Sequence, residues 1–226
     1  MATIPSPKRH PYHQWAPDAR ALDIVGDKWT LLIVRDLSAG PRRFVELQRV
    51  LPGISTEQLR SRLTRMVAAG LLTRQRYREV PPRVDYELTK RSEDLLPVIG
   101  ALARWGYDWA WSASRKSEAI DIGAILRIAP GIVDAPASLN ATAQFTVHHD
   151  STTKCYALTI AQQHVTIREC HNEHSDVHVQ GAQRDWIEAL GPHNDRTGLQ
   201  IQGDTHLATI LLDGVSALTP PAAQVA

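Results

Sequence analysis

Apolar residues recur at helical spacing through the first half of the chain. The pattern predicts a helix over residues 18–38 that is ended by the Gly-Pro pair at 40–41, and Gly26 is a point where it can kink or locally thin. A second, short helix is predicted over residues 43–50. The side chains that the short helix is expected to bury are Phe44, Val45 and Leu47. A Leu-Pro-Gly turn at 51–53 follows, so a third helix is expected to begin immediately after it.

The third predicted helix begins with a capping box, because the Ser55 hydroxyl is followed three residues later by Gln58. Leu59, Leu63 and Met66 follow the i, i+4, i+7 rule and are expected to face inward. The opposite side then carries hydrogen-bonding side chains that can reach DNA bases or phosphates: Glu57, Arg60, Ser61, Thr64 and Arg65. The alternative is an ordinary solvated face, although such faces usually hold more Glu and Lys. Helix, turn and capped helix form the skeleton of a helix-turn-helix.

An arginine-rich hairpin is predicted next. Residues 73–77 and 84–88 alternate as strands around a Pro-Pro tip at 79–82. Arginines share one face of the hairpin or lie just beyond its tip: Arg74, Arg76, Arg78 and Arg83. Guanidinium groups in such a wing would lie against phosphates or in a minor groove. The alternative is a sheet edge that charge protects from aggregation.

A helix over residues 97–111 is expected to present Leu102, Trp105 and Trp109 along one side. Together with Trp111, these residues offer more apolar area than a small domain readily buries, which predicts a partner surface. The partner is either a second copy of the chain or the chain's own C-terminal half. A dimer suits DNA reading, because two recognition helices about 34 Å apart match a palindromic site.

The second half of the chain predicts an α+β domain with an antiparallel sheet. One helix is expected between residues 122 and 129, followed by four alternating segments that read as an antiparallel meander with one buried face. The segments are 143–147, 156–160, 165–167 and 177–179. Helices at 182–190 and 204–212 follow, and residues 216–226 are expected to form a disordered tail.

Charge separates the two halves. Residues 1–116 hold 20 Lys and Arg against 12 Asp and Glu, whereas the remaining residues hold 5 against 12. A basic module suits a polyanion and an acidic one does not, although charge asymmetry alone also fits a merely solvated surface. We therefore expect an N-terminal DNA-binding and dimerisation domain over residues 12–112 and a separate domain over 118–215, joined by a short polar linker at 112–117.

Cysteine usage and the N-terminus predict a cytoplasmic protein. Cys155 and Cys170 form neither a C-x-x-C pair nor a disulfide framework, which favours a reducing compartment. Residues 1–17 are rich in proline and polar residues and lack the apolar core of an export signal. No run is apolar and long enough for a membrane span, so we expect no membrane partner.

Four motifs in the first half resemble the HxlR family of winged-helix bacterial regulators, in order and in spacing, over residues 12–111. They are ARALDIVGDKWTLL at 19–32, GPRRF at 40–44, LPGIS at 51–55 and PPRVDYELT at 81–89. The resemblance implies a dimeric transcription factor whose first and last helices build the dimer. The family often carries a redox-sensing cysteine just before the first helix. Residues 14–16 are Gln, Trp and Ala here, so thiol sensing is not expected in this domain.

The second half resembles the sterol-carrier-protein type 2 fold over about residues 118–215. The likeness rests on segments 177–181 and 199–204 and on the leucine-rich helix that follows. It implies a pocket for a small hydrophobic or amphipathic molecule between sheet and helices. The expected lining residues, each of which could equally be plain core, are Phe145, Tyr156, Leu158, Ile167, Trp186, Leu207 and Leu211.

Metal, cofactor and catalytic chemistry find little support. One cysteine and three histidines lie close in sequence: Cys170, His171, His174 and His178. They lack the paired spacing of a structural zinc site, so the sequence favours solvated loop histidines over a metal site. The chain has no nucleophile elbow, zinc-protease motif, Walker loop or dinucleotide fingerprint. We expect no metal, no cofactor and no enzymatic activity.

The sequence thus predicts a transcriptional regulator that binds palindromic double-stranded DNA as a homodimer and responds to a small apolar effector in its C-terminal domain. The alternatives are a carrier of lipids or hydrophobic metabolites, or a small-molecule enzyme, with a vestigial winged helix. Arg60, Ser61 and Thr64 are expected to read bases, while Arg65, Arg42 and Arg43 hold phosphates. The full set of expected DNA contacts is Arg42, Arg43, Ser55, Thr56, Glu57, Arg60, Ser61, Thr64, Arg65, Arg74, Arg76, Arg78 and Arg83.

Overall fold

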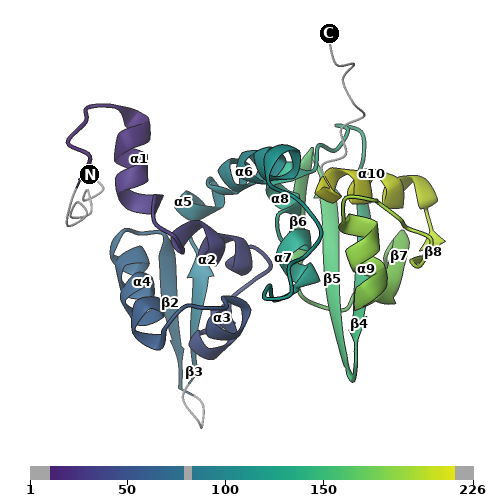
Figure 1. Ribbon diagram of the computed structural model, residues 1–226, viewed down its shortest axis with the longest axis horizontal. Helices are drawn as coiled ribbons and strands as arrows, with labels where there is room; N and C mark the ends of the chain where they lie inside the picture. Colours follow the sequence, from purple (N-terminus) through teal and green to yellow (C-terminus); the bar gives the residue numbers. More distant parts are fainter. Residues whose placement is uncertain (1–10, 79–82, 217–226) are drawn as a thin grey trace. The chain divides into compact units, whose positions relative to one another are not determined.

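The computed structural model describes residues 11–78 and 83–216 (Figure 1). The predicted hairpin tip at 79–82 and all of the predicted tail except Ser216 lie outside these ranges. The chain divides into two compact units, Met1–Leu95 and Leu96–Ala226. This division falls ahead of the linker expected at 112–117, because the last helix of the predicted DNA-binding domain packs within the second unit.

The first unit combines helices with a small antiparallel sheet of strand order β1-β3-β2. Its elements are α1 (Pro17–Val25), α2 (Thr30–Leu37), β1 (Arg42–Arg43), α3 (Phe44–Val50), α4 (Thr56–Ala68), β2 (Leu72–Tyr77), β3 (Arg83–Leu88) and α5 (Lys90–Glu93). The predicted helix-turn-helix and hairpin correspond to α3, α4, β2 and β3. Strand β1 was not predicted, because two residues are too few to show alternation; it pairs Arg42 with Tyr86 and Arg43 with Asp85.

The single helix expected over residues 18–38 is wrong, because α1 and α2 are separate helices. Gly26 ends α1, and its N–H donates to the carbonyl of Leu22 at 2.8 Å. The Asp27 carboxylate then accepts the N–H groups of Trp29 at 2.9 Å and Thr30 at 3.1 Å, which satisfies donors at the start of α2. The side-chain cap therefore favours a new helix over a continuous one.

Helix α4 has the predicted cap and buried side. The Ser55 hydroxyl accepts the Gln58 N–H at 3.2 Å, and the Gln58 side chain accepts the Ser55 N–H at 3.2 Å, so both halves of the capping box are present. Leu59, Leu63 and Met66 are all buried, as predicted. In α3, by contrast, only Leu47 is buried. The expectation that Val45 is buried is wrong, because a short helix covers the core with one turn and Val45 lies on its exposed side.

The second unit is built on a five-stranded sheet of order β6-β5-β4-β7-β8. Its elements are α6 (Leu96–Trp109), α7 (Ile122–Leu126), α8 (Ala129–Ile132), β4 (Ala141–His149), β5 (Thr152–Ala161), β6 (His164–Arg168), β7 (Val177–Ala182), α9 (Gln183–Leu190), β8 (Gln200–Gly203) and α10 (Thr205–Ser216). The α+β class is confirmed. The single helix expected between 122 and 129 is instead the pair α7 and α8, with Pro130 in the first turn of α8, where no N–H is required.

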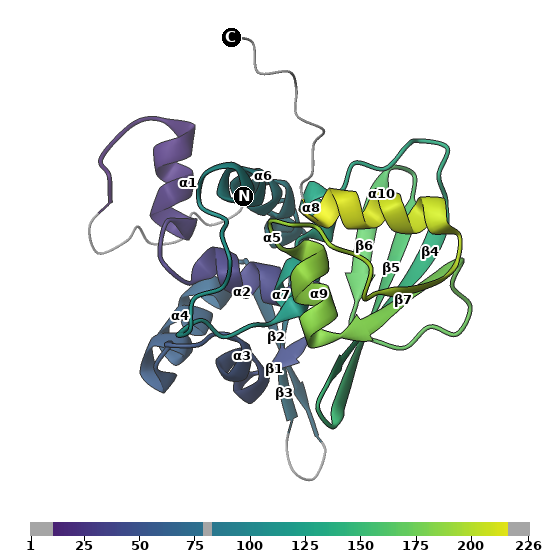
Figure 2. The ribbon, with the colours of Figure 1, turned by 45° about the vertical axis from the view of Figure 1, so that its right-hand side comes forward.

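The expected antiparallel meander is wrong in one respect. Strands β4, β5 and β6 do pair antiparallel, but β7 pairs parallel to β4, with Phe145 opposite Val179. Alternating apolar residues decide which face of a strand is buried, yet they do not decide which neighbour it pairs with or in which direction. Helices α9 and α10 pack on the sheet at β4 and β7 (Figure 2).

Helix α6 is held in the second unit by close backbone packing. A Cβ atom at Gly100 would collide with the carbonyl oxygen of Gly131, so α6 and α8 touch at two glycines. The Arg104 side chain donates to the carbonyl of Ile132 at 2.6 Å, and the Tyr107 hydroxyl donates to that of Val215 at 2.7 Å. The other side of α6 leaves an apolar set exposed, as predicted for its tryptophans: Val98, Leu102, Trp105 and Trp109.

No helix in the described ranges is both long and apolar enough to cross a membrane.

Candidate nucleic-acid interface

The exposed side of α4 presents a row of hydrogen-bonding groups opposite its buried leucines. Glu57, Arg60, Thr64 and Arg65 are exposed and Ser61 is half-buried. Arg60 pairs with Glu57 at 3.2 Å, and Arg65 donates to the Ser61 hydroxyl at 3.1 Å. Both partners lie on the same helix surface in contact with solvent, where such pairs contribute roughly 1 kcal/mol or less. A phosphate or a base edge can therefore displace them.

The start of α4 carries the two remaining predicted residues of this helix. Ser55 is occupied as the N-cap, with its hydroxyl accepting the Gln58 N–H. The Thr56 hydroxyl accepts the Gln48 side-chain amide at 2.8 Å, which ties the start of α4 to α3. These hydrogen bonds orient the start of α4. Both residues are also exposed, so they remain accessible to a partner in solvent.

An ion pair that the sequence reading missed fixes α4 from behind. The Arg62 guanidinium lies 2.9 Å from the Asp27 carboxylate, the same group that caps α2, and both side chains are mostly buried. Burial lowers the pKa of Arg62, while Asp27 acts in the opposite sense and Arg65 adds to the lowering. A sequence signal existed: Arg62 is three residues from Leu59 and four from Met66, so helical spacing places its charge on the apolar side.

The hairpin offers arginines in two different states. Arg74 and Arg76 alternate along one face of β2 and Arg78 follows, and all three are exposed. Arg83 is instead engaged with the buried Asp85 carboxylate, with its Nε 2.9 Å from Oδ1, and its guanidinium lies 5.2 Å from the centre of the Tyr77 ring. The predicted wing set therefore divides into three outward arginines and one that stabilises the hairpin.

Arg42 and Arg43 are also partly committed to the fold. The Arg42 Nε donates to the backbone carbonyl of Asp36 at 2.9 Å, and the Arg43 guanidinium lies 4.0 Å from the Asp85 carboxylate. Their pairing in the three-stranded sheet brings them beside the middle of β3. Helix α4 packs against β2, so the α4 face and the hairpin arginines belong to one structural block (Figure 1).

The residues expected to line an apolar pocket in the second unit are gathered together, but as closed core. They come from β4, β5, β6, α9 and α10, and each is at most 3% exposed: Phe145, Tyr156, Leu158, Ile167, Trp186, Leu207 and Leu211. Phe145 and Trp186 pack ring to ring with centroids 5.5 Å apart. Burial of this degree is what the alternative of plain core predicts for these residues.

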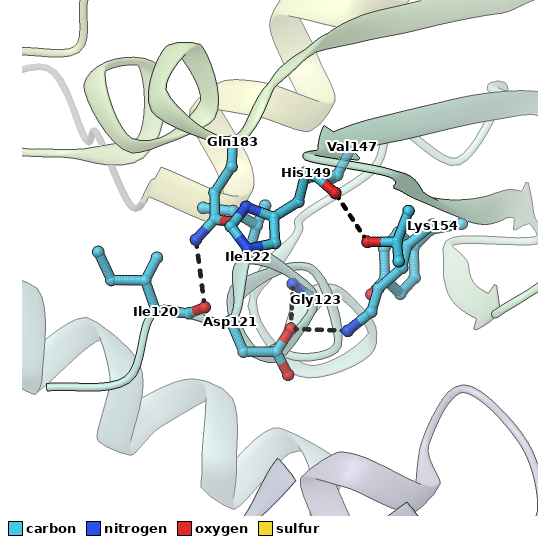
Figure 3. Close-up of a pocket in the computed structure, with 10 residues that line it drawn as sticks. Ile120, Asp121, Ile122, Gly123, Val147, His149, Lys154 and Gln183 are labelled. Atoms are coloured by element: carbon cyan, nitrogen blue, oxygen red, sulfur yellow. Dashed lines mark hydrogen bonds and ion pairs between the residues drawn. The ribbon is translucent and has the colours of Figure 1, made fainter. Parts of the chain in front are cut away.

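A small cleft of about 90 Å³ lies at one edge of this core, and of the predicted set only Tyr156 lines it (Figure 3). Its other walls include Asp121, His149, Lys154 and Gln183 among polar residues and Ile120, Ile122 and Val147 among apolar ones. Within the described part of the chain, the structure brings together no group of three or more His, Cys, Asp or Glu side chains suited to a metal ion.

Comparison with known proteins places the first part of the chain in a family. The model of the HxlR-like helix-turn-helix family matches residues 24–114, from the end of α1 through α6. An uncharacterized HTH-type transcriptional regulator of Synechocystis is 40% identical over 93 residues, which are 41% of this chain and 69% of that protein. A second one, YkvN of Bacillus subtilis, is 38% identical over 84 residues, or 37% and 71% of the two chains.

Among solved structures, the oxidized form of the redox regulator HypR is 32% identical, with a TM-score of 0.40, over 41% of this chain and 96% of that one. The two curated relatives are named as transcriptional regulators, so the prediction of a regulator rather than an enzyme is confirmed. The chain belongs to the HxlR-like helix-turn-helix family of transcriptional regulators.

Proposed function

We propose that this regulator binds a two-fold symmetric DNA operator as a homodimer, with α4 in the major groove and the β2–β3 hairpin against the backbone or minor groove. The observation that carries the proposal is the exposed face of α4, where Arg60, Ser61, Thr64 and Arg65 lie opposite a buried leucine stripe. A helix with this division inserts its polar side without disturbing its own packing.

The contacts made within the protein sharpen the expected roles. Arg60, Ser61 and Thr64 read base edges, and Arg65 holds a phosphate, since their own partners are exposed and weak. Arg74, Arg76 and Arg78 supply the wing contacts. Arg42, Arg43 and Arg83 are already engaged with Asp36 and Asp85, so they contribute less to DNA binding than the outward arginines.

The dimer is proposed to form through the exposed apolar side of α6 together with α1. Trp105 and Trp109 are 59% and 77% exposed, which leaves a large aromatic area in water. Covering this area with a second copy removes it from solvent, and two copies supply the two recognition helices that a palindromic site with half-sites about 34 Å apart requires.

The second unit is proposed to carry effector control. A ligand changes operator affinity only if it binds two arrangements of the protein with different affinity. The seven residues first expected to line an apolar cavity are buried, as plain core would be. The sterol-carrier likeness of residues 118–215 stays a prediction.

The test is fluorescence anisotropy of the full chain on DNA from its own upstream region, over a salt series. With about six phosphates neutralised per dimer, log K should fall with log salt at a slope near −5. Arg60→Ala should lose roughly 1–3 kcal/mol on the operator and far less on random DNA. Arg184→Ala, an exposed arginine of α9, is the matched control and should leave binding unchanged.

Weak wild-type binding that is equal on all sequences would contradict the proposal. If Arg60→Ala weakened binding equally on operator and random DNA, Arg60 would be a phosphate contact rather than a base reader.

A further inference from the structure

The cleft at the start of α7 is built around charges rather than apolar surface. Figure 3 shows Asp121 and Lys154 on its wall, with the Lys154 Nζ 3.7 Å from the Asp121 carboxylate. Both side chains reach solvent, at 47% exposed for Lys154 and 22% for Asp121. An ion pair this long and this exposed is weak, so a small molecule can enter between its two members.

Behind this pair lies a fully buried arginine. The Arg127 guanidinium lies 3.0 Å from Asp121 and 3.3 Å from Glu169, and 3.4 Å from the Tyr156 hydroxyl. Burying a charge is costly, and an apolar residue would fill the same space at lower cost. We therefore assign Arg127 the role of positioning the Asp121 carboxylate and the Tyr156 hydroxyl, which both lie on the cleft wall.

The cleft wall presents charges of both signs side by side. Asp121 and Lys154 line it as neighbours, and Arg127 lies behind Asp121. A molecule with both signs matches this wall, because its acid group can pair with Lys154 while its ammonium group pairs with Asp121. Ile120, Ile122 and Val147 leave an apolar strip for a short aliphatic part.

We propose that this cleft is the effector site of the regulator and that it binds a small zwitterion of the amino-acid class. The inference rests on the proposed function, which it deepens by naming the ligand chemistry. A volume of about 90 Å³ limits the ligand to a small molecule.

The fold connects the cleft to the proposed dimer helix through backbone contacts. Asp121 caps α7, with its carboxylate accepting the Gly123 N–H at 3.1 Å, and Gly123 has no room for a side chain beside Tyr156. Helix α7 leads directly into α8, whose Gly131 touches Gly100 of α6. A ligand that draws Asp121 toward itself therefore acts on α7, α8 and α6 in turn.

The experiment titrates the full chain by NMR or calorimetry with three probes of similar size: β-alanine, acetate and ethylammonium. β-Alanine should bind at least tenfold more tightly than either single-charge probe. Lys154→Met and Asp121→Asn should each weaken it at least tenfold. Arg184→Met is the control for loss of one exposed positive charge and should bind like the wild type. Lys154→Met removes an exposed side chain, so it tests the site even if Asp121→Asn disturbs the α7 cap.

Operator affinity is measured on the same samples. The expected result is a change of at least threefold with saturating β-alanine that is absent in Lys154→Met. Equal binding of acetate and β-alanine, or no binding of any probe, would overturn the cleft proposal. If the operator is bound but no probe is, the cleft inference fails and the proposed function stands. If β-alanine binds at the cleft but no operator is bound, the proposed function fails instead.

Discussion

The polar face of α4 and the apolar cluster around Phe145 show two ways in which periodic residues are used. Along α4, spacing separates buried leucines from exposed arginines, and the exposed groups are available to a partner. In the second unit, alternation turns Phe145 and Leu158 to the buried side of the sheet, and the Phe145 ring packs against Trp186 of α9. A convex face requires only that side chains point outward. A cavity also requires that neighbouring side chains leave a volume empty, and this depends on the packing of several elements.

The largest expected effect tests the closed core directly. Phe145→Ala should destabilise the protein by roughly 3–5 kcal/mol, because it deletes a fully buried ring. Urea unfolding measures the change. If Phe145 lined an open ligand pocket, the loss would be small and the contrast with α4 would disappear. Thr64→Ala on α4 serves as the exposed counterpart and should change stability by about 0.5 kcal/mol or less.

A second prediction concerns the glycine contact between α6 and α8. Gly100→Ala should destabilise the protein by about 1–3 kcal/mol, since the new methyl group meets the backbone of Gly131. Gly106→Ala lies in the same helix with open space around it and should stabilise by about 0.5–1 kcal/mol. Thermal unfolding measures the melting temperature of each variant. Equal changes in the two melting temperatures would show that α6 does not pack on α8 at Gly100.

A third prediction separates positioning from contact on α4. Asp27→Asn weakens the pairing with Arg62 behind the helix, so operator affinity should fall about tenfold while the salt slope stays that of the wild type. Arg62→Met should also lower operator affinity. Arg62→Lys should recover less than half of that loss, because lysine reaches Asp27 with different geometry. A reduced salt slope in Asp27→Asn would instead assign these residues to phosphate contacts.

The smallest expected effect lies at Tyr107. Tyr107→Phe should cost about 1 kcal/mol, because the Val215 carbonyl loses its donor. Burial raises the pKa of Tyr107, so the wild type keeps this stability below the unfolded value of about 10 and loses it as the pH rises further. The difference in unfolding free energy between wild type and Tyr107→Phe should therefore narrow above pH 10. A difference independent of pH would show that the hydroxyl is not buried.

Local sequence patterns predicted most elements of the first unit, but they did not predict the strand pairing of the second. The capping box at Ser55 and the spacing of Leu59, Leu63 and Met66 are short-range patterns, and the structure has them as predicted. Gly26 indicated a kink, but the full break into two helices was not predicted, because its cause is the Asp27 side-chain cap within an otherwise helical pattern. The parallel pairing of β7 with β4 could not be predicted, since it joins segments about thirty residues apart and leaves the alternation unchanged.

The candidate sites follow the same division. The outward residues of α4 and β2 could be named from spacing alone, whereas the commitment of Arg42 and Arg83 to Asp36 and Asp85 depends on the sheet. The cleft at Asp121 could not be found in the sequence, because its walls come from the linker before α7, from the β4–β5 hairpin and from the start of α9.

The contact between Gly100 and Gly131 also limits how this regulator can be recombined with its relatives. A glycine inside a helix costs about 0.5–1 kcal/mol relative to alanine, and here that cost is explained by the approach of α8. Helix α6 nevertheless lies within the family-matched residues 24–114. In a chimera that exchanges the second unit, the junction would therefore have to lie before Leu96. Helices α6 and α8 then come from the same protein and keep their glycine contact.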